Sequence, residues 1–239
     1  MSGTLYAVGV GPGAPDLLTL RAARVLGGVG VILAAASPRN DASAALETAR
    51  THVRPDARIL RLDFPMTRDA ATLRAAWRAA AEATLAVLSG GEDAAFLTIG
   101  DPLIYSTFGY LLRTVRELSP ETPVEVIPGI TSFQAAAAVT QTILCEGEES
   151  LSILPGIRAG ERLAEELARA DMAVILKAYR NFPAIVRALE KTGRAADALL
   201  ASHVERPEAR VRRGVSEGDA RPPYMSLILS PGRPDGDDG

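Results

Sequence analysis

Short apolar runs alternate with longer amphipathic segments along the first 143 residues of the chain. The short runs end in glycine or in a Gly/Pro pair, which is typical of buried strands followed by tight turns. In the longer segments apolar side chains recur at helical spacing. The pattern predicts strands at residues 5–10, 29–33, 58–62, 94–99 and 124–127, and helices at 16–26, 42–52, 69–87, 106–118 and 132–139. This alternation predicts an α/β fold with a mainly parallel sheet covered on both faces.

The polar stretch at residues 141–149 interrupts this alternation and is expected to link two domains. Beyond it the pattern predicts strands at 150–154, 173–177, 198–204 and 224–229, and helices at 161–170 and 181–190. Fewer helices per strand favour a smaller, mixed α/β domain. The expected division is therefore 1–143 and 144–230. Residues 231–239, rich in Pro, Gly and Asp, are expected to form a disordered tail.

The composition of this 239-residue chain indicates its cellular location and whether it binds a metal. It has no apolar run of about 18 residues, and its N-terminus lacks the layout of a signal peptide, so we expect no membrane partner. The single Cys145 fits a reducing compartment, and the expected location is cytoplasmic. One cysteine and two histidines, His52 and His203, are too few for a zinc site, so no metal is expected.

Charge gives a further indication of the ligands. A net charge of −3 provides no general attraction to nucleic acid, and no nucleic-acid partner is expected. The only lysines are Lys177 and Lys191, so 24 of the 26 basic residues are arginine. Arginine suits bidentate recognition of carboxylates, although a general compositional bias toward alanine and arginine also explains the count.

The first candidate motif is the loop Gly9–Ala14, which fits the dinucleotide-binding fingerprint loosely. Two features argue against NAD. Residues 34–37 read Ala-Ala-Ala-Ser, where an acidic residue would meet the ribose. Pro12 removes a backbone donor from the would-be phosphate-binding loop. A phosphate-free cofactor such as S-adenosylmethionine needs fewer such donors; the alternative is a tight glycine turn without a ligand.

Two more motifs follow predicted strands. In Thr98–Ser106, the Asp101 carboxylate can accept hydrogen bonds from a ligand, or it can simply tie its loop together while Ser106 caps the next helix. In Ile127–Ser132, two hydroxyls stand at a helix start. One of them is expected to cap the helix, and the other can reach a ligand carboxylate.

In this order and spacing, the G-x-G-P-G, G-D-P and I-P-G-I-T-S loops resemble the tetrapyrrole methylase superfamily. The resemblance extends from Thr4 to about Pro231. It implies two α/β domains of the tetrapyrrole methylase type, with the cofactor in the inter-domain cleft and usually a homodimer. The implied cofactor is S-adenosyl-L-methionine, which leaves as S-adenosyl-L-homocysteine.

Finer features resemble the branch of this superfamily that methylates carbon 20 of precorrin-2. They are Phe64-Pro65-Met66-Thr67, Ile104-Tyr105-Ser106-Thr107-Phe108, Ser132-Phe133-Gln134-Ala135-Ala136 and Lys177-Ala178-Tyr179-Arg180-Asn181. The implied substrate is precorrin-2. The cobalt-bearing form of the ring and another corrin position remain alternatives. From different classes, an NAD-dependent oxidoreductase and a non-catalytic tetrapyrrole carrier also stay open.

The same resemblance implies particular site residues. The expected cofactor contacts are Pro12, Ile99, Gly100, Asp101, Ile104, Thr131, Ser132, Lys177, Ala178, Met225 and Ser226. Asp101 and Tyr105 are the catalytic candidates, with Glu205 a further possible base. The candidate arginines for substrate carboxylates are Arg39, Arg68, Arg113 and Arg180, with Arg206 nearby. Because the methyl group is already activated on sulfur, the enzyme is expected to act mainly through proximity, orientation and exclusion of water.

Overall fold

The computed structural model describes residues 2–36, 43–156 and 160–232. The chain folds into two compact units, one up to Thr131 and one from Ser132 onward. Each unit has its own five-stranded sheet. This architecture confirms the predicted α/β class with two sheets, and each unit is described by itself below.

The first unit contains a parallel sheet with strand order β3-β2-β4-β1-β5. Its strands are β1 (Leu5–Gly9), β2 (Val31–Ala36), β3 (Arg58–Asp63), β4 (Ala94–Thr98) and β5 (Val124–Ile127). The inner strands are almost wholly buried. Both faces of these strands meet helices, which explains why the sequence there reads as continuous apolar runs.

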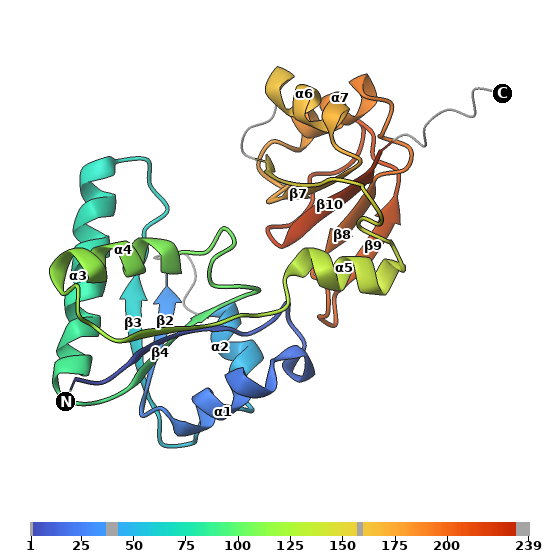
Figure 1. The fold of residues 1–239 in the computed structure, drawn as a ribbon. Helices are drawn as coiled ribbons and strands as arrows, with labels where there is room; N and C mark the ends of the chain where they lie inside the picture. Colours follow the sequence, from blue (N-terminus) through green and yellow to red (C-terminus); the bar gives the residue numbers. More distant parts are fainter. Residues whose placement is uncertain (1, 37–42, 157–159, 233–239) are drawn as a thin grey trace. The chain divides into compact units, whose positions relative to one another are not determined.

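Helices cover both faces of this sheet (Figure 1). The helices are α1 (Leu20–Gly28), α2 (Ala44–Ala49), α3 (Ala70–Ser89) and α4 (Phe108–Leu118), with a short 3₁₀ turn η1 (Pro15–Leu17). Successive strand residues point to opposite faces, so Phe96 packs with α3 and α4 while Leu97 packs with α1 and α2. Side-chain caps fix two helix starts: Thr19 accepts from the Ala22 N–H, and Asp69 accepts from the Thr72 N–H.

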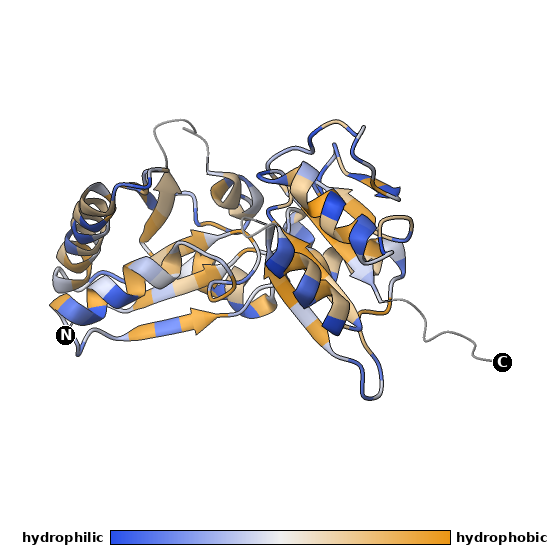
Figure 2. Ribbon diagram, turned by 90° about the horizontal axis from the view of Figure 1, so that it is seen from above, coloured by the Kyte–Doolittle hydropathy of each residue, from blue (hydrophilic) through white to orange (hydrophobic). Residues whose placement is uncertain are grey.

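The second unit has a mixed sheet of order β6-β7-β10-β8-β9. Its elements are α5 (Ser132–Thr140), β6 (Leu151–Pro155), α6 (Glu161–Arg169), β7 (Met172–Leu176), α7 (Phe182–Lys191), β8 (Leu199–Ser202), β9 (Arg210–Arg213) and β10 (Ser226–Pro231). Only β6 and β7 pair in parallel; the other pairings are antiparallel. Helices α6 and α7 pack on one face and α5 on the other. Figure 2 shows the hydrophobic strands of both sheets.

The division between the units differs from the sequence-based one at 143/144, because α5 belongs to the second unit. Phe133 and Ala136 of α5 pack against Val174 and Leu227 of the second sheet. The sequence shows only that this segment is a helix, whereas its packing partners come from strands far along the chain.

The C-terminal end of the second sheet also extends past the predicted boundary of the tail. Pro231 is the last residue of β10, and the Gly232 N–H donates to the Asp171 carbonyl. The predicted tail therefore begins inside a paired strand. Residues 233–239 lie outside the described part of the chain.

Among the described residues, no helix combines the length and the apolar character that crossing a bilayer requires.

Three loops meet in backbone contact at the carboxyl edge of the first sheet. They follow β1, β4 and β5, which are neighbours in the sheet. A Cβ added to Gly9 would lie 2.5 Å from the Gly100 carbonyl oxygen, and one on Gly129 would overlap the same oxygen and lie 2.8 Å from the Gly9 Cα. The Gly100 N–H also donates to the Gly11 carbonyl at 2.8 Å. Only glycine permits this approach of the three loops.

Replacing Gly129 with alanine should therefore destabilise the protein by about 1–3 kcal/mol, because the new methyl group meets backbone that cannot rotate away. The measurement is the free energy of unfolding from chemical denaturation. Gly28→Ala is the matched control, because a Cβ there meets nothing within 4 Å. That control should be neutral or slightly stabilising. Equal stability of Gly129→Ala and wild type would contradict the loop contact.

Candidate functional site

Asp101 joins two of the three loops at the edge of the first sheet. One oxygen of its carboxylate accepts from the Leu103 N–H at 2.8 Å, and the other accepts from the Gly129 N–H at 3.1 Å. The first bond closes the turn after Asp101, and the second connects the loop after β4 to the loop after β5. The carboxylate thus has the loop-tying contacts that the sequence left as one of two interpretations.

Ser106 fixes the end of the same loop. Its Oγ accepts from the Phe108 N–H at 3.0 Å and lies 3.0 Å from the Thr98 Oγ1. Helix α4 begins at Phe108, and Thr107 at its N-cap makes no side-chain capping bond. Ser106 therefore supplies the cap from one position earlier, and links it to the last residue of β4.

Between Asp101 and Ser106 the loop presents exposed apolar side chains. Leu103 is 63% exposed, Ile104 37% and Tyr105 46%. Tyr105 has φ 51°, a left-handed conformation that is uncommon for an aromatic residue. Strained backbone of this kind tends to occur where a ligand is bound. Thr131, at the end of the neighbouring loop, is buried, and Ser132 begins α5.

The candidate arginines of the first unit occupy different places. Arg113 on α4 holds its guanidinium 5.2 Å from the centre of the Tyr110 ring. Tyr110 in turn stacks on Trp77 of α3, with the ring centres 4.4 Å apart. Arg68 is exposed in the loop after β3. Arg39 lies outside the described residues.

In the second unit, the predicted cofactor residues come together at one edge of the sheet. The end of β7 pairs with the start of β10, and the start of β10 pairs with the end of β8. The buried Ala178 donates its N–H to the Ser226 carbonyl at 3.3 Å. The Met225 carbonyl accepts from the His203 N–H at 2.8 Å. Segments 22 and 48 residues apart in sequence therefore form one local structure.

This second edge also carries unusual backbone and charge. Lys177, His203 and Glu205 all have φ between 50° and 61°. Burial, with the neighbouring Arg180 charge adding to it, lowers the pKa of Lys177 from its ordinary value. His203 Nδ1 lies 3.6 Å from a Glu208 oxygen.

The structure adds Arg221 to this edge, a residue that the sequence did not point to. Arg221 donates from Nε to the Tyr179 carbonyl, 42 residues away in sequence. Tyr224 packs against Tyr179 with ring centres 5.1 Å apart. Arg221 lies in an irregular stretch without periodicity, so no local signal pointed to it.

No cluster of three or more His, Cys, Asp or Glu side chains in the described ranges has the arrangement that a metal ion needs.

Comparison with characterised sequences finds relatives that match the chain almost end to end. A cobalt-precorrin-2 C(20)-methyltransferase of Salmonella typhimurium is 36% identical over 231 residues, which cover 96% of each chain. A precorrin-2 C(20)-methyltransferase of a Sinorhizobium species is also 36% identical, over 240 residues and 96% of each chain.

Solved structures show the same fold. A cobalt precorrin-4 methyltransferase has a TM-score of 0.73 and 19% identity, covering 95% of this chain and 94% of its own. A uroporphyrin-III C-methyl transferase from Thermus thermophilus, complexed with S-adenyl homocysteine, has a TM-score of 0.68 and 22% identity, covering 97% and 98%. At these identities the likeness concerns the fold alone.

The family model of the tetrapyrrole (corrin/porphyrin) methylases matches residues 4–217, which include all three glycine loops and most of the second sheet. The chain therefore belongs to the tetrapyrrole methylases, a family of methyltransferase enzymes.

Proposed function

We propose that this enzyme transfers a methyl group from S-adenosyl-L-methionine to carbon 20 of precorrin-2, giving precorrin-3A, in cobalamin biosynthesis. The observation that carries the proposal is the near end-to-end similarity to C(20)-methyltransferases. The relative named for the cobalt-bearing ring and the one named for precorrin-2 are equally similar, at 36% identity. Methylation of cobalt-precorrin-2 is therefore the second candidate.

The loops at the first edge fit a phosphate-free cofactor. None of Gly9–Ala14, Thr98–Ser106 and Ile127–Ser132 contains a lysine or an arginine. A phosphate group would call for such cations or for a free backbone nest, and Pro12 has no N–H. A Cβ on Gly100 would have only the Thr131 Cα near it, at 3.8 Å, so this side of Gly100 is uncrowded.

The residues at the edges of the two sheets are proposed to bind different parts of S-adenosyl-L-methionine. In the first unit, Pro12, Ile99, Gly100 and Ile104 line the cofactor, and Thr131 and Ser132 contact its methionine part. In the second unit, the backbone of Lys177 and Ala178 and of Met225 and Ser226 holds the adenine. We also propose, from the family resemblance, that the enzyme is a homodimer and acts in the cytoplasm.

When bound, the cofactor supplies a methyl group on a positively charged sulfur, which carbon 20 attacks in line. The protein's residues then have to hold the donor and the ring in the geometry of the transfer and exclude water. Both effects lower the activation barrier without a catalytic side chain. After the transfer, a proton is lost from carbon 20. The candidate acceptors are Asp101 and Tyr105.

Asp101 already accepts two backbone hydrogen bonds, which favours a positioning role for it over a role as base. Its carboxylate holds the turn that presents Ile104 and Tyr105. A neutral amide in its place could accept only one of these bonds and would turn an N–H toward the other donor.

Anaerobic incubation with S-adenosyl-L-methionine should add one methyl group to precorrin-2, measured by mass spectrometry, with S-adenosyl-L-homocysteine released in equal amount. Cobalt-precorrin-2 is assayed in parallel. Methylation of the cobalt-bearing ring alone would keep the reaction class and select the second candidate. Cofactor binding without methylation of either ring would contradict the proposed function.

Asp101→Asn should raise the dissociation constant for S-adenosyl-L-homocysteine at least tenfold, because the amide can accept only one of the two backbone hydrogen bonds that the carboxylate accepts. The dissociation constant is measured by calorimetry. The pH dependence of kcat should keep the wild-type shape. The matched control is Asp93→Asn, since Asp93 accepts from the Thr4 N–H at 2.7 Å at the amino edge of the same sheet. Unchanged cofactor affinity with an altered pH profile would instead identify Asp101 as the base.

A further inference from the structure

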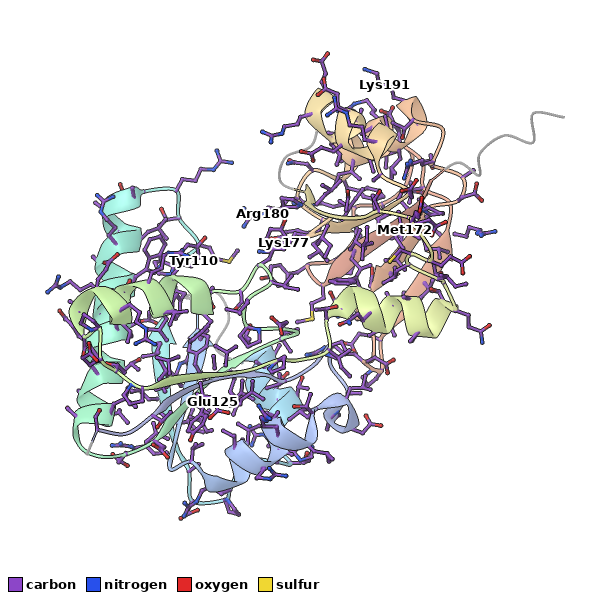
Figure 3. All side chains as sticks on the ribbon, viewed as in Figure 1. Tyr110, Glu125, Met172, Lys177, Arg180 and Lys191 are labelled. Atoms are coloured by element: carbon purple, nitrogen blue, oxygen red, sulfur yellow. The ribbon has the colours of Figure 1, made fainter. Side chains whose placement is uncertain are left out.

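An aromatic and cationic cluster occupies the edge of the second sheet where β7 ends and β10 begins. It consists of Tyr179, Arg180, Arg221 and Tyr224, and we call it the Tyr179 cluster. Figure 3 shows Arg180 and Lys177 projecting from the loop at the end of β7. Tyr179 directly follows Ala178, and Tyr224 directly precedes Met225, so the cluster adjoins the backbone segments proposed to hold the cofactor.

Both guanidinium groups are held against Tyr179. The guanidinium carbons of Arg180 and Arg221 each lie 5.8 Å from the centre of its ring. Arg180 Nε donates to the Tyr179 hydroxyl at 2.9 Å, and Arg221 Nε donates to the Tyr179 carbonyl. Tyr224 packs on the same tyrosine. Each of the two arginine side chains is thereby fixed through its Nε, and so it loses less conformational entropy when it binds a ligand.

The outer ends of these two arginines are unoccupied by protein groups. In the described part of the chain, no hydrogen bond or ion pair engages the terminal nitrogens of Arg180 or Arg221. Two other exposed arginines of the same unit have carboxylate partners: Arg187 pairs with Glu217, and Arg212 with Asp219. The cluster thus presents two guanidinium groups that are held in place through Nε and have no carboxylate partner among the described residues.

We propose that the Tyr179 cluster binds carboxylate side chains of the tetrapyrrole substrate through the terminal nitrogens of Arg180 and Arg221. This inference rests on the proposed function and adds a specificity site to it. A planar guanidinium group complements a carboxylate through paired, charge-assisted hydrogen bonds. The adenine of the cofactor is uncharged and cannot neutralise two guanidinium groups, whereas the carboxylates of the tetrapyrrole ring can. The cluster therefore suits the acidic ring better than the adenine. Anchoring one acidic arm would set which ring carbon meets the methyl group.

The test compares Arg180→Gln, Arg221→Gln and the double variant with Arg187→Gln, an exposed arginine of the same unit. Each single cluster variant should raise the KM for the ring substrate about ten- to a hundredfold, the range expected for one charged hydrogen-bonding group. The dissociation constant for S-adenosyl-L-homocysteine should stay within about twofold of wild type. Arg187→Gln should change neither quantity.

A stable probe separates this inference from the proposed reaction. Fluorescence titration with uroporphyrin, whose rings all bear carboxylates, and with its methyl ester needs no turnover. Wild type should bind the acid more tightly than the ester, and the double variant should lose most of that difference. The inference stands on this result even if neither precorrin is methylated.

Two results would overturn the inference. One is a double variant with wild-type KM and the wild-type preference for the acid. The other is a rise in the cofactor dissociation constant as large as the rise in KM, which would assign the cluster to the cofactor. Circular dichroism and thermal unfolding of each variant establish that it is folded before either result is interpreted.

Discussion

The contact among three backbone loops at the carboxyl edge of the first sheet is the constraint on which the candidate site depends. Gly9, Gly100 and Gly129 come so close that a methyl group on the first or third would meet the carbonyl oxygen of Gly100. Asp101 secures the contact by accepting from the Gly129 N–H. These glycines therefore satisfy a packing requirement first. Their arrangement leaves a backbone-lined edge whose three loops contain no lysine or arginine, which suits a cofactor that carries no phosphate.

The two units present edges of different chemistry. The edge of the first sheet offers glycine backbone, hydroxyls and exposed apolar side chains from Leu103 to Tyr105. The edge of the second sheet offers fixed guanidinium groups over Tyr179. Glycine backbone permits the close approach of a ligand, whereas fixed guanidinium groups suit a carboxylate. The proposed cofactor contacts and the proposed carboxylate anchor follow this difference.

Backbone strain is concentrated at the same edges. Five described residues other than glycine have positive φ, and Tyr105, Lys177, His203 and Glu205 all follow the ends of strands in these two places. Such conformations cost free energy and persist only when the surrounding contacts impose them. The hydrogen bonds of the neighbouring loops supply these contacts, as the bond from the His203 N–H to Met225 shows.

The sequence by itself determined the α/β class, most of the strands and helices and the family, because periodicity, glycine loops and motif spacing are local properties. It also located the loops in which we propose the cofactor contacts. Tertiary structure decided what depends on distant contacts. Helix α5 joined the second unit through Val174 and Leu227. The exposed β9, Arg210–Arg213, has no apolar alternation and exists by pairing with β8. Only the fold showed that Asp101 ties two loops and that Arg221 reaches Tyr179, because hydrogen bonds between separate segments leave no periodic signal in either one.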